Sequence, residues 1–330
     1  MHRIEHFTRN AVLKGLLGVM LLTLSPLLAI EKVGITSFQF LKVMTDARST
    51  GMGEAYSAVA SSSAAVFWNP AALTRIKRAD LAFSHANWFL DTQHFSFAAA
   101  YELPGRGTVG FQALTVDYGS IEETRVDHLM FIDNVYNPGL TGRTLQPGAN
   151  VFGLSFARRL TDRFAFGLTM KYASEDLVLE SASSMMFDLG ILYRTGYRSL
   201  QLAATIRHFG PEIKYIDESF PLPQTFNIGI SANLISPQDN FLLSSEDHSL
   251  LFAFDLIQPR DYDQQYNMGF EYAWTSLIFL RSGYKINYDT AGLSLGAGVK
   301  VRNIRIDYSF NDHGQYLGTV HRFTLGASID

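Results

Sequence analysis

The sequence predicts an all-β fold: a transmembrane antiparallel β-barrel of about 14 strands that follows a short helical, plug-like N-terminal segment. The first observation is alternation, because residues 164–172 carry large apolar side chains at every second position and small or polar ones between. Successive side chains of a strand point to opposite faces, so this run has one apolar and one polar face. The apolar face suits lipid, and the polar face suits the lumen of a barrel.

The second observation is the number and length of such runs. They recur from residue 80 to the end of the chain, and many approach the roughly nine to eleven residues that cross a bilayer at a tilt. Their starts lie near Leu81, Phe95, Val109, Val151, Phe164, Phe187, Leu200, Phe226, Leu250, Tyr266, Ile278, Leu293, Ile304 and His321. The alternative is a soluble β-sandwich with its apolar face buried.

The third observation is the spacing of the connections. Tight turns are expected at 161–163, 195–198, 274–276 and 301–303, and longer loops at 119–149, 173–184 and 209–223. Short turns on one side and long loops on the other are typical of outer-membrane barrels. Residues 233–247 are the exception, since they form a long connection where a short one is expected. An even strand number would place both termini on the periplasmic side.

Composition narrows the possible functions. The chain has 330 residues, 47% of them hydrophobic, and its mean hydropathy of +0.05 is too low for a bundle of transmembrane helices. It contains no Cys, which excludes disulfides, thiolate metal ligands and thiol nucleophiles. The nine His residues show no metal-ligand spacing. We therefore expect neither a metal nor a cofactor.

Residues 1–29 are predicted to be a secretory signal peptide. Arg3, Arg9 and Lys14 give it a basic start, residues 15–28 are apolar, and Ala29 is a plausible cleavage point. The alternative is a retained membrane anchor. The whole chain has a net charge of −4, and removing three basic residues and one acidic residue with the signal leaves −6. That charge argues against nucleic acid as a partner, and export to the outer membrane of a Gram-negative-type bacterium is expected.

Residues 30–79 lack the alternation and are predicted to form a plug or a periplasmic cap, before a barrel at 80–330. Short helices are expected at 37–42 and 54–60. Asn69 is suited to cap a helix that begins at Pro70.

This segment also carries a set of motifs: residues 37–42, then Ala47, Arg48, Gly51, Met52 and Gly53, and finally Trp68, Asn69, Pro70 and Ala71. Together they resemble the opening motif of the PorV/PorQ family of outer-membrane barrels, which are related to the long-chain fatty-acid (FadL-like) transporters. The chain departs from the family pattern at residues 61–63, where three serines replace a frequent acidic pair. It also departs at Asp330, where an aromatic residue is common.

The resemblance implies a barrel of about 14 strands with the N-terminal segment folded into or against its lumen. It also implies two possible functions. The first is a binding or shuttle component of type IX-like protein secretion, with secreted cargo proteins or other secretion components as partners. The alternative is passive transport of hydrophobic small molecules, for which an apolar pocket is expected near Trp68. Outer-membrane lipid is a partner in both cases.

Charged residues on the polar face are predicted to line the lumen: Lys171, Asp188, Arg194, Arg207, Glu271, Arg281, Lys300, Arg305, Asp307 and Arg322. A cationic side chain facing lipid at mid-bilayer would cost about 2–4 kcal/mol. One interpretation is a salt-bridged filling that makes the barrel rigid. The other is a polar path, or a docking wall for the N-terminal segment, in which Arg48 pairs with Asp188, Glu271 or Asp307.

No catalytic residue is predicted, and the chain is not expected to be an enzyme. Residues 292–296 match G-x-S-x-G, but a nucleophile elbow needs a strand, a turn and a helix, whereas Ser294 continues a strand. His313 is expected to be a solvated loop residue. Asp261 and Asp263 have the right chemistry for calcium, but the rest of a binding loop is lacking.

The predicted loop at 119–149 contains an unusual apolar group: Leu129, Met130, Phe131, Ile132, Val135 and Tyr136. Apolar residues in an exposed loop indicate a lid or a partner surface. The alternative is a loop that folds over the barrel mouth.

Overall fold

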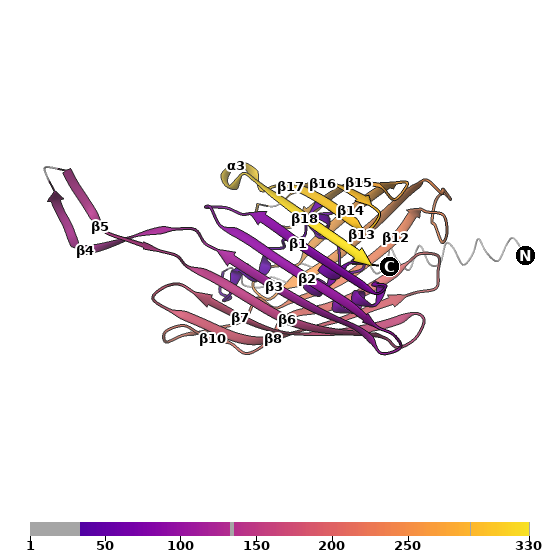
Figure 1. The fold of residues 1–330 in the computed structure, drawn as a ribbon, viewed down its shortest axis with the longest axis horizontal. Helices are drawn as coiled ribbons and strands as arrows, with labels where there is room; N and C mark the ends of the chain where they lie inside the picture. Colours follow the sequence, from indigo (N-terminus) through magenta and orange to yellow (C-terminus); the bar gives the residue numbers. More distant parts are fainter. Residues whose placement is uncertain (1–33, 133–134, 291, 330) are drawn as a thin grey trace, which may run out of the picture. The chain divides into compact units, whose positions relative to one another are not determined.

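A closed antiparallel β-barrel of 14 strands dominates the computed structural model, which describes residues 34–132, 135–290 and 292–329 (Figure 1). The prediction of an all-β barrel is confirmed, while the predicted signal peptide lies outside the described residues. The barrel strands are β1 (Ala79–Asn87), β2 (Gln93–Leu103), β3 (Gly107–Asp117), β6 (Gly148–Arg159), β7 (Phe164–Asp176), β8 (Ser181–Arg194), β9 (Gln201–Phe209), β12 (Thr225–Ile235), β13 (His248–Pro259), β14 (Gln265–Trp274), β15 (Ile278–Ile286), β16 (Leu293–Val301), β17 (Ile304–Asp312) and β18 (Thr319–Ile329).

Strands pair with their neighbours in chain order, and β1 closes the barrel by pairing with β18, from Ala79 opposite Ile329 to Asn87 opposite His321. Two smaller sheets lie in the connections. They are formed by β4 (Ile121–Ile132) with β5 (Val135–Leu145), and by β10 (Ile213–Lys214) with β11 (Ser219–Phe220). Closure matters because it leaves no unpaired strand edge, which a lipid environment would not tolerate.

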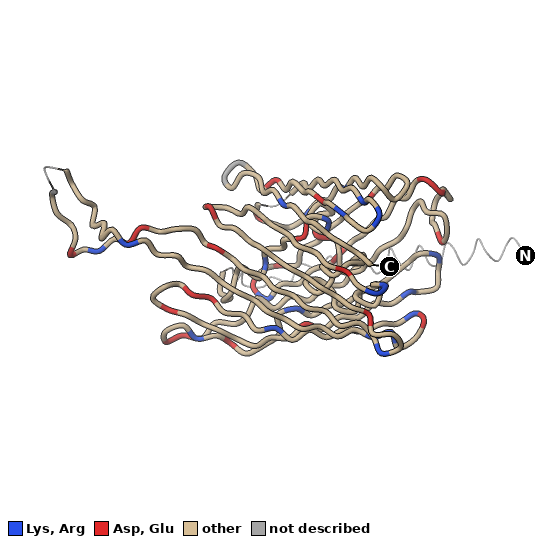
Figure 2. Tube along the Cα trace, viewed as in Figure 1, with Lys and Arg blue, Asp and Glu red and all other residues tan. Residues whose placement is uncertain are grey.

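The barrel strands form a wall whose outer and lumen faces differ, as the alternating sequence pattern requires. Along β7, Ala165, Gly167, Thr169 and Lys171 are buried inside, whereas Leu168 and Met170 are 41% and 48% exposed on the outside. Large apolar side chains are exposed in the same way on β8, β17 and β18. Charged residues lie mainly toward strand ends and loops, and long stretches of the strands carry none (Figure 2). An apolar outer face of this extent fits hydrocarbon better than water.

The two ends of the barrel differ in their connections. At the end where β1 begins and β18 ends, called the short-turn end here, residues 104–106, 275–277 and 302–303 form tight turns. The elaborated connection of that end is 236–247, where Ile235 forms an isolated bridge with Leu243. The opposite long-loop end carries residues 118–147, where the β4–β5 hairpin projects away from the barrel (Figure 1).

One predicted long loop is wrong. Residues 173–184 were expected to be a loop, but β7 runs to Asp176 and β8 starts at Ser181, which leaves only residues 177–180 to connect them. The ladder continues to Asp176 opposite Ser181. It continues because strand pairing depends on backbone hydrogen bonds, and these persist after the outward side chains have become polar.

The described residues before β1, 34–78, lie inside the barrel and are called the inner segment below. It forms the short helices η1 (Gln39–Lys42), α2 (Ala47–Gly51), η2 (Ser63–Phe67) and η3 (Pro70–Arg75). It enters at the long-loop end, where the backbone N–H of Ser37 donates to the Pro221 carbonyl, and it reaches the short-turn end at Ala79. No helix of residues 34–132, 135–290 or 292–329 has the length and apolar character needed to cross a membrane.

Glycines on the lumen face allow this segment to touch the wall. A Cβ on Gly167 of β7 would lie 2.3 Å from the Pro70 carbonyl carbon, and one on Gly283 of β15 would lie 2.1 Å from the Gly53 nitrogen. Such distances leave no room for any side chain. The small residues of the alternating pattern are therefore contact points for the inner segment.

Candidate functional site

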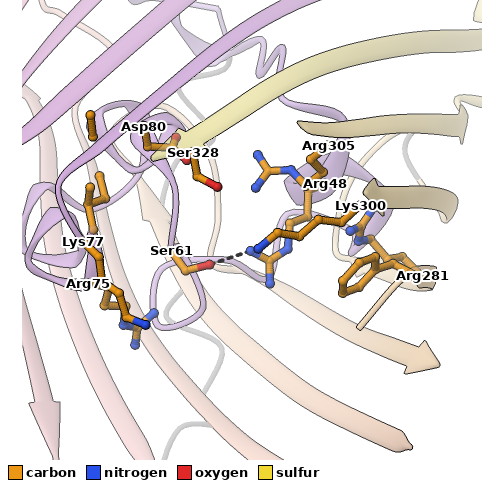
Figure 3. Close-up of a pocket in the computed structure, with 12 residues that line it drawn as sticks. Arg48, Ser61, Arg75, Lys77, Asp80, Arg281, Lys300, Arg305 and Ser328 are labelled. Atoms are coloured by element: carbon orange, nitrogen blue, oxygen red, sulfur yellow. Dashed lines mark hydrogen bonds between the residues drawn. The ribbon is translucent and has the colours of Figure 1, made fainter. Parts of the chain in front are cut away.

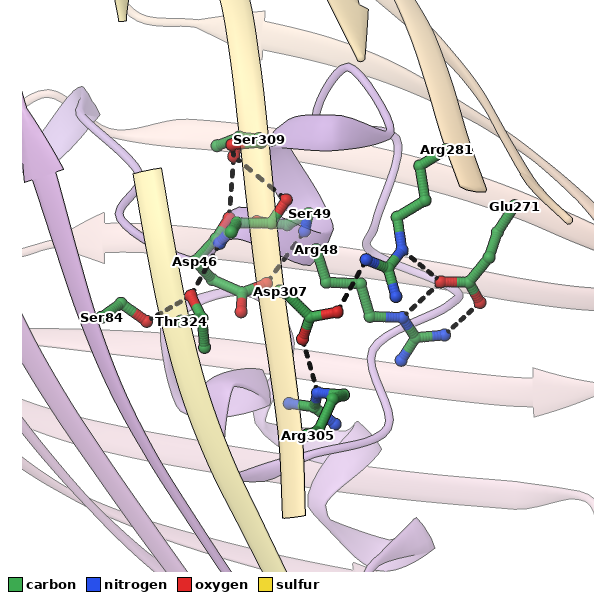
Figure 4. A network of polar contacts seen from close by, with 12 residues as sticks. Asp46, Arg48, Ser49, Ser84, Glu271, Arg281, Arg305, Asp307, Ser309 and Thr324 are labelled. Atoms are coloured by element: carbon green, nitrogen blue, oxygen red, sulfur yellow. Dashed lines mark hydrogen bonds and ion pairs between the residues drawn. The ribbon is translucent and has the colours of Figure 1, made fainter. Parts of the chain in front are cut away.

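A chain of five charged side chains joins the inner segment to the wall (Figure 4). The guanidinium of Arg48, on α2, donates two hydrogen bonds to the Glu271 carboxylate on β14: Nε to Oε2 at 2.8 Å and Nη2 to Oε1 at 2.7 Å. Arg281 donates to the same carboxylate at 2.6 Å and to Asp307 at 2.7 Å. Arg305 donates to the second Asp307 oxygen at 2.6 Å. Of the three carboxylates considered for Arg48, the structure selects Glu271.

A second buried group lies across β7, β8 and β9. Lys171 Nζ is 2.7 Å from Asp188 Oδ2 and 2.9 Å from His208 Nδ1. The backbone N–H of His208 donates to the other Asp188 oxygen at 2.7 Å. His208 adopts a left-handed conformation (φ 58°) where the β8–β9 register shifts. Neither His208 nor this bulge was foreseen from the sequence.

The other predicted lumen charges take separate positions. The Arg207 guanidinium stacks 5.1 Å from the Trp68 ring, and buried Arg322 donates to the Met44 carbonyl at 2.7 Å. Lys300 is partly exposed near the short-turn end, and Arg194 is exposed at the end of β8. The charges thus form several groups rather than one continuous polar path.

The residues of the N-terminal motif contact the wall. Asn69 caps η3 by accepting from the Ala71 N–H, and its amide donates to the carbonyls of Ser57 and Ile191 at 2.9 and 3.1 Å. Trp68 and Met52 are fully buried. Ala47 donates to Thr324 on β18, and a Cβ on Gly51 would lie 3.0 Å from Gly296. These residues hold the inner segment in place.

An apolar cavity of about 520 Å³ opens at the long-loop end. Trp88, Phe89 and Leu90 line it from the β1–β2 connection, and Phe40 and Val43 line it from the inner segment; the other lining residues are Gln39, Thr92, His94, Tyr118 and Leu317. None carries a permanent charge. Its volume lies within the range of about 300–1,000 Å³ that is usual for small-molecule sites.

Two polar groups border this cavity. His94 is buried, and neither of its ring nitrogens has a hydrogen-bond partner among the residues that the structure describes. The Tyr118 hydroxyl donates to Glu175 at 2.6 Å, and burial together with this hydrogen bond raises the pKa of Tyr118. Tyr118 therefore stays uncharged near neutral pH.

A much smaller cavity of about 30 Å³ lies deeper, beside Trp68. Leu41, Met44 and Phe67 line it from the inner segment, and Leu114 and Val151 line it from the wall. The polar lining residues are Thr45, Asp46, Gln112, Lys171 and His208. Val43 lines both this space and the larger one. The two spaces therefore follow each other along the inner segment, and the inner one holds roughly one water molecule.

A third cavity, of about 260 Å³, lies at the short-turn end between the inner segment and the wall (Figure 3). Its charged lining is Arg48, Arg75, Lys77, Asp80, Arg281, Lys300 and Arg305. Arg48 reaches Ser61 at 2.7 Å across it. Burial lowers the pKa of Arg75 to about 10, with Arg194 and Arg48 acting in the same direction. Sequence analysis missed Arg75 and Lys77 because they lie outside the alternating pattern.

The side chains with enzyme-like or calcium-like patterns have other contacts. Ser294 lies within β16 and accepts a hydrogen bond from Asn311 at 2.8 Å. Asp261 pairs with Lys42 at 2.6 Å. The prediction that His313 is solvated is wrong, because it is buried with its ring edge-on to Trp88 and Phe89. Among the described residues, no group of three or more His, Asp or Glu side chains is placed to hold a metal ion.

The apolar group of residues 119–149 lies near the tip of the β4–β5 hairpin. Phe131 is 73% exposed and Val135 is 70% exposed, while Phe131 packs on Tyr136. The region was expected to be a loop; it forms its own two-stranded sheet, and the hairpin projects outward instead of folding over the mouth.

Fold and site together define a closed β-barrel with an apolar outside, a filled lumen and an apolar cavity at its long-loop end. No protein-family profile matches the chain, and no curated protein matches it either. Among solved structures it is similar to the Pseudomonas putida toluene transporter TodX (11% identity, 84% of this chain and 95% of that chain, TM-score 0.52). It is also similar to a Pseudomonas aeruginosa FadL homologue (13% identity, 87% and 99%, TM-score 0.51). At these identities the similarity establishes the fold.

Proposed function

We propose that this protein resides in the outer membrane and admits hydrophobic small molecules through its long-loop end, without catalysis. The observation that carries the proposal is the 520 Å³ cavity with its uncharged, aromatic-rich lining. Apolar surface of this kind favours ligands that water excludes. In this orientation the long loops face the exterior, and the start of β1 and the end of β18 face the periplasm, as is usual for outer-membrane barrels.

The cavity beside Trp68 extends the route inward. Because Val43 lines both spaces, a molecule that leaves the outer cavity meets the inner segment at this residue. The inner space is too small for a ligand in the state described, so passage requires the segment to shift. TodX is named a toluene transporter, which agrees in kind with this proposal.

The test is uptake of a hydrophobic fluorescent probe by liposomes that contain the full chain. The wild-type protein should accelerate entry over empty liposomes, and Val43→Arg should abolish the acceleration because it places a charge at the junction of the two cavities. Lys214→Gln, on the exposed β10 strand, is the matched control and should behave as wild type. Equal entry rates with wild-type and Val43→Arg protein would refute the route.

The role in protein secretion that the PorV/PorQ resemblance implies is a second candidate. The exposed apolar tip of the β4–β5 hairpin supports it, because such a surface fits a protein partner. Co-purification from outer membranes should then recover secreted proteins or secretion components with the wild-type chain. Phe131→Ser should lose them. Recovery of the same proteins with the wild-type chain and with Phe131→Ser would show that the hairpin tip does not bind them.

A further inference from the structure

The cavity at the short-turn end holds more positive charge than the described residues neutralise. Six cationic side chains line it: Arg48, Arg75, Lys77, Arg281, Lys300 and Arg305. The one carboxylate in the lining is Asp80, which accepts from the Ser63 N–H at 2.6 Å. Glu271 and Asp307 neutralise part of the charge from the wall. The buried carboxyl group of Asp46 also lies in this network, beside Arg48 and Arg305. With all four carboxylates ionised, the six cations around this cavity still leave an excess of two positive charges among the residues described.

The arrangement of Lys300 and Arg305 leaves part of this positive charge without a partner. Lys300 on β16 lies directly opposite Arg305 on β17, and like charges facing each other destabilise a strand pair. Arg305 Nε donates a hydrogen bond to Asp307, whereas the buried Nη2 has no hydrogen-bond partner among the residues described. A buried donor without an acceptor is costly. An anion between the Lys300 and Arg305 side chains would remove the repulsion between them.

We propose that this cavity binds a phosphate group. A volume of about 260 Å³ accommodates a phosphate or a small phosphate ester and is too small for a folded partner. Arginine offers parallel N–H donors that match phosphate oxygens, and lysine adds a point charge. A dianion neutralises more of the excess than a carboxylate does. The cavity is on the lumen side of the wall, so the phosphate comes from the periplasm or from a headgroup that enters the mouth.

The bound group would act as a bridge. Arg75 and Lys77 belong to the inner segment and its exit, while Lys300 and Arg305 belong to the wall, and both sets face the same space (Figure 3). A phosphate that contacts both sets holds the inner segment against β16 and β17. Its binding therefore stabilises the filled state of the lumen at this end.

The test is thermal unfolding and calorimetric titration of the full chain in detergent micelles, with inorganic phosphate compared with chloride at equal ionic strength. Phosphate should raise the Tm of the wild-type protein. Lys300→Gln and Lys77→Gln should each weaken phosphate binding by roughly tenfold or more, since each removes a charged hydrogen-bond donor. Lys300→Gln should also raise the Tm without phosphate, because its repulsion with Arg305 is lost.

Lys214→Gln on β10 is the control and should keep the full response to phosphate. Glycerol phosphate and short-chain phosphatidic acid distinguish the sources: preference for the lipid identifies a headgroup site, and equal binding of inorganic phosphate identifies a soluble ligand. The proposal is overturned if phosphate and chloride give the same Tm for the wild-type protein. It is also overturned if the double variant Lys77→Gln/Lys300→Gln responds as strongly as the wild type.

Discussion

The two ends of the lumen are opposite in character. The cavity at the long-loop end has about 520 Å³ and an uncharged aromatic lining, whereas the cavity at the short-turn end has about 260 Å³ and six cationic side chains. The inner segment contributes to both, with Phe40 and Val43 at one end and Arg75 and Lys77 at the other. The difference shows that this segment, as much as the wall, sets the polarity of each end.

The largest expected effect comes from removing the anchor at the cationic end. Glu271→Ala leaves Arg48 and Arg281 buried without their shared carboxylate, and breaking such a pair costs about 3–5 kcal/mol. The Tm in detergent should fall accordingly. Asp127→Ala, in the exposed Arg125–Asp127 pair of the hairpin, should leave the Tm unchanged. A small loss with Glu271→Ala would mean that the segment is held at the other end.

A methyl group on the lumen face should separate the segment from the wall. Gly167→Ala places a Cβ 2.3 Å from the Pro70 carbonyl carbon, and overpacking of this kind costs about 1–3 kcal/mol. Because backbone must move, the ion conductance of the barrel in planar bilayers should increase. Gly292→Ala is the control, since the nearest heavy atom to its Cβ lies at 3.9 Å. Unchanged conductance in both variants would show that the segment seals the lumen without this contact.

Loss of one aromatic ring from the apolar cavity should weaken the binding of hydrophobic molecules at the long-loop end. Trp88→Ala removes a ring from the outer cavity, and aromatic contacts contribute about 0.5–1.5 kcal/mol. Binding of a hydrophobic ring probe, measured by fluorescence titration, should weaken about three- to tenfold. Trp274→Ala at the short-turn end should bind the probe as the wild type does. Equal losses in the two variants would place the probe outside the cavity.

The smallest expected effect is a pH response of the β17–β18 connection. Burial lowers the pKa of His313 from 6.5 to about 4, and the positive charges of Lys285 and Arg322 add to this shift. The packed loop thus favours the neutral imidazole, so its stability is full above pH 6.5 and is lost as the pH falls toward 4. Hydrogen exchange of residues 313–318 should quicken across that window. In His313→Phe the exchange rates should follow only the ordinary chemical dependence on pH.

Alternation predicted the wall well, because lipid on one side and polar contacts on the other impose a period of two. It failed at residues 173–184 because the outward side chains Ser174 and Asp176 are polar, which ends the alternation although the ladder continues. The hairpin was missed because β4 and β5 pair only with each other, outside the barrel sheet, so the barrel imposes no alternation on them.

The site was harder to predict because it joins distant segments. The charge pattern placed Glu271 and Asp307 on the lumen face, but choosing Glu271 for Arg48 requires the path of the inner segment across β14. The outer cavity brings together Phe40, Trp88 and Leu317, which no spacing rule connects. The lumen glycines were visible as small residues, yet their contacts with Pro70 and Gly53 depend on the same path.

That path has a consequence for how the molecule is assembled. The segment before β1 runs the full length of the lumen, from Ser37 near Pro221 to Ala79 opposite Ile329. The seam between the first and last strands joins the most distant parts of the sequence, and such pairings form late. Once the seam has paired, a ring of hydrogen-bonded strands surrounds the segment, so the segment can enter or leave only along the barrel axis. Placing the segment before the seam pairs would avoid threading it lengthwise through a finished cylinder.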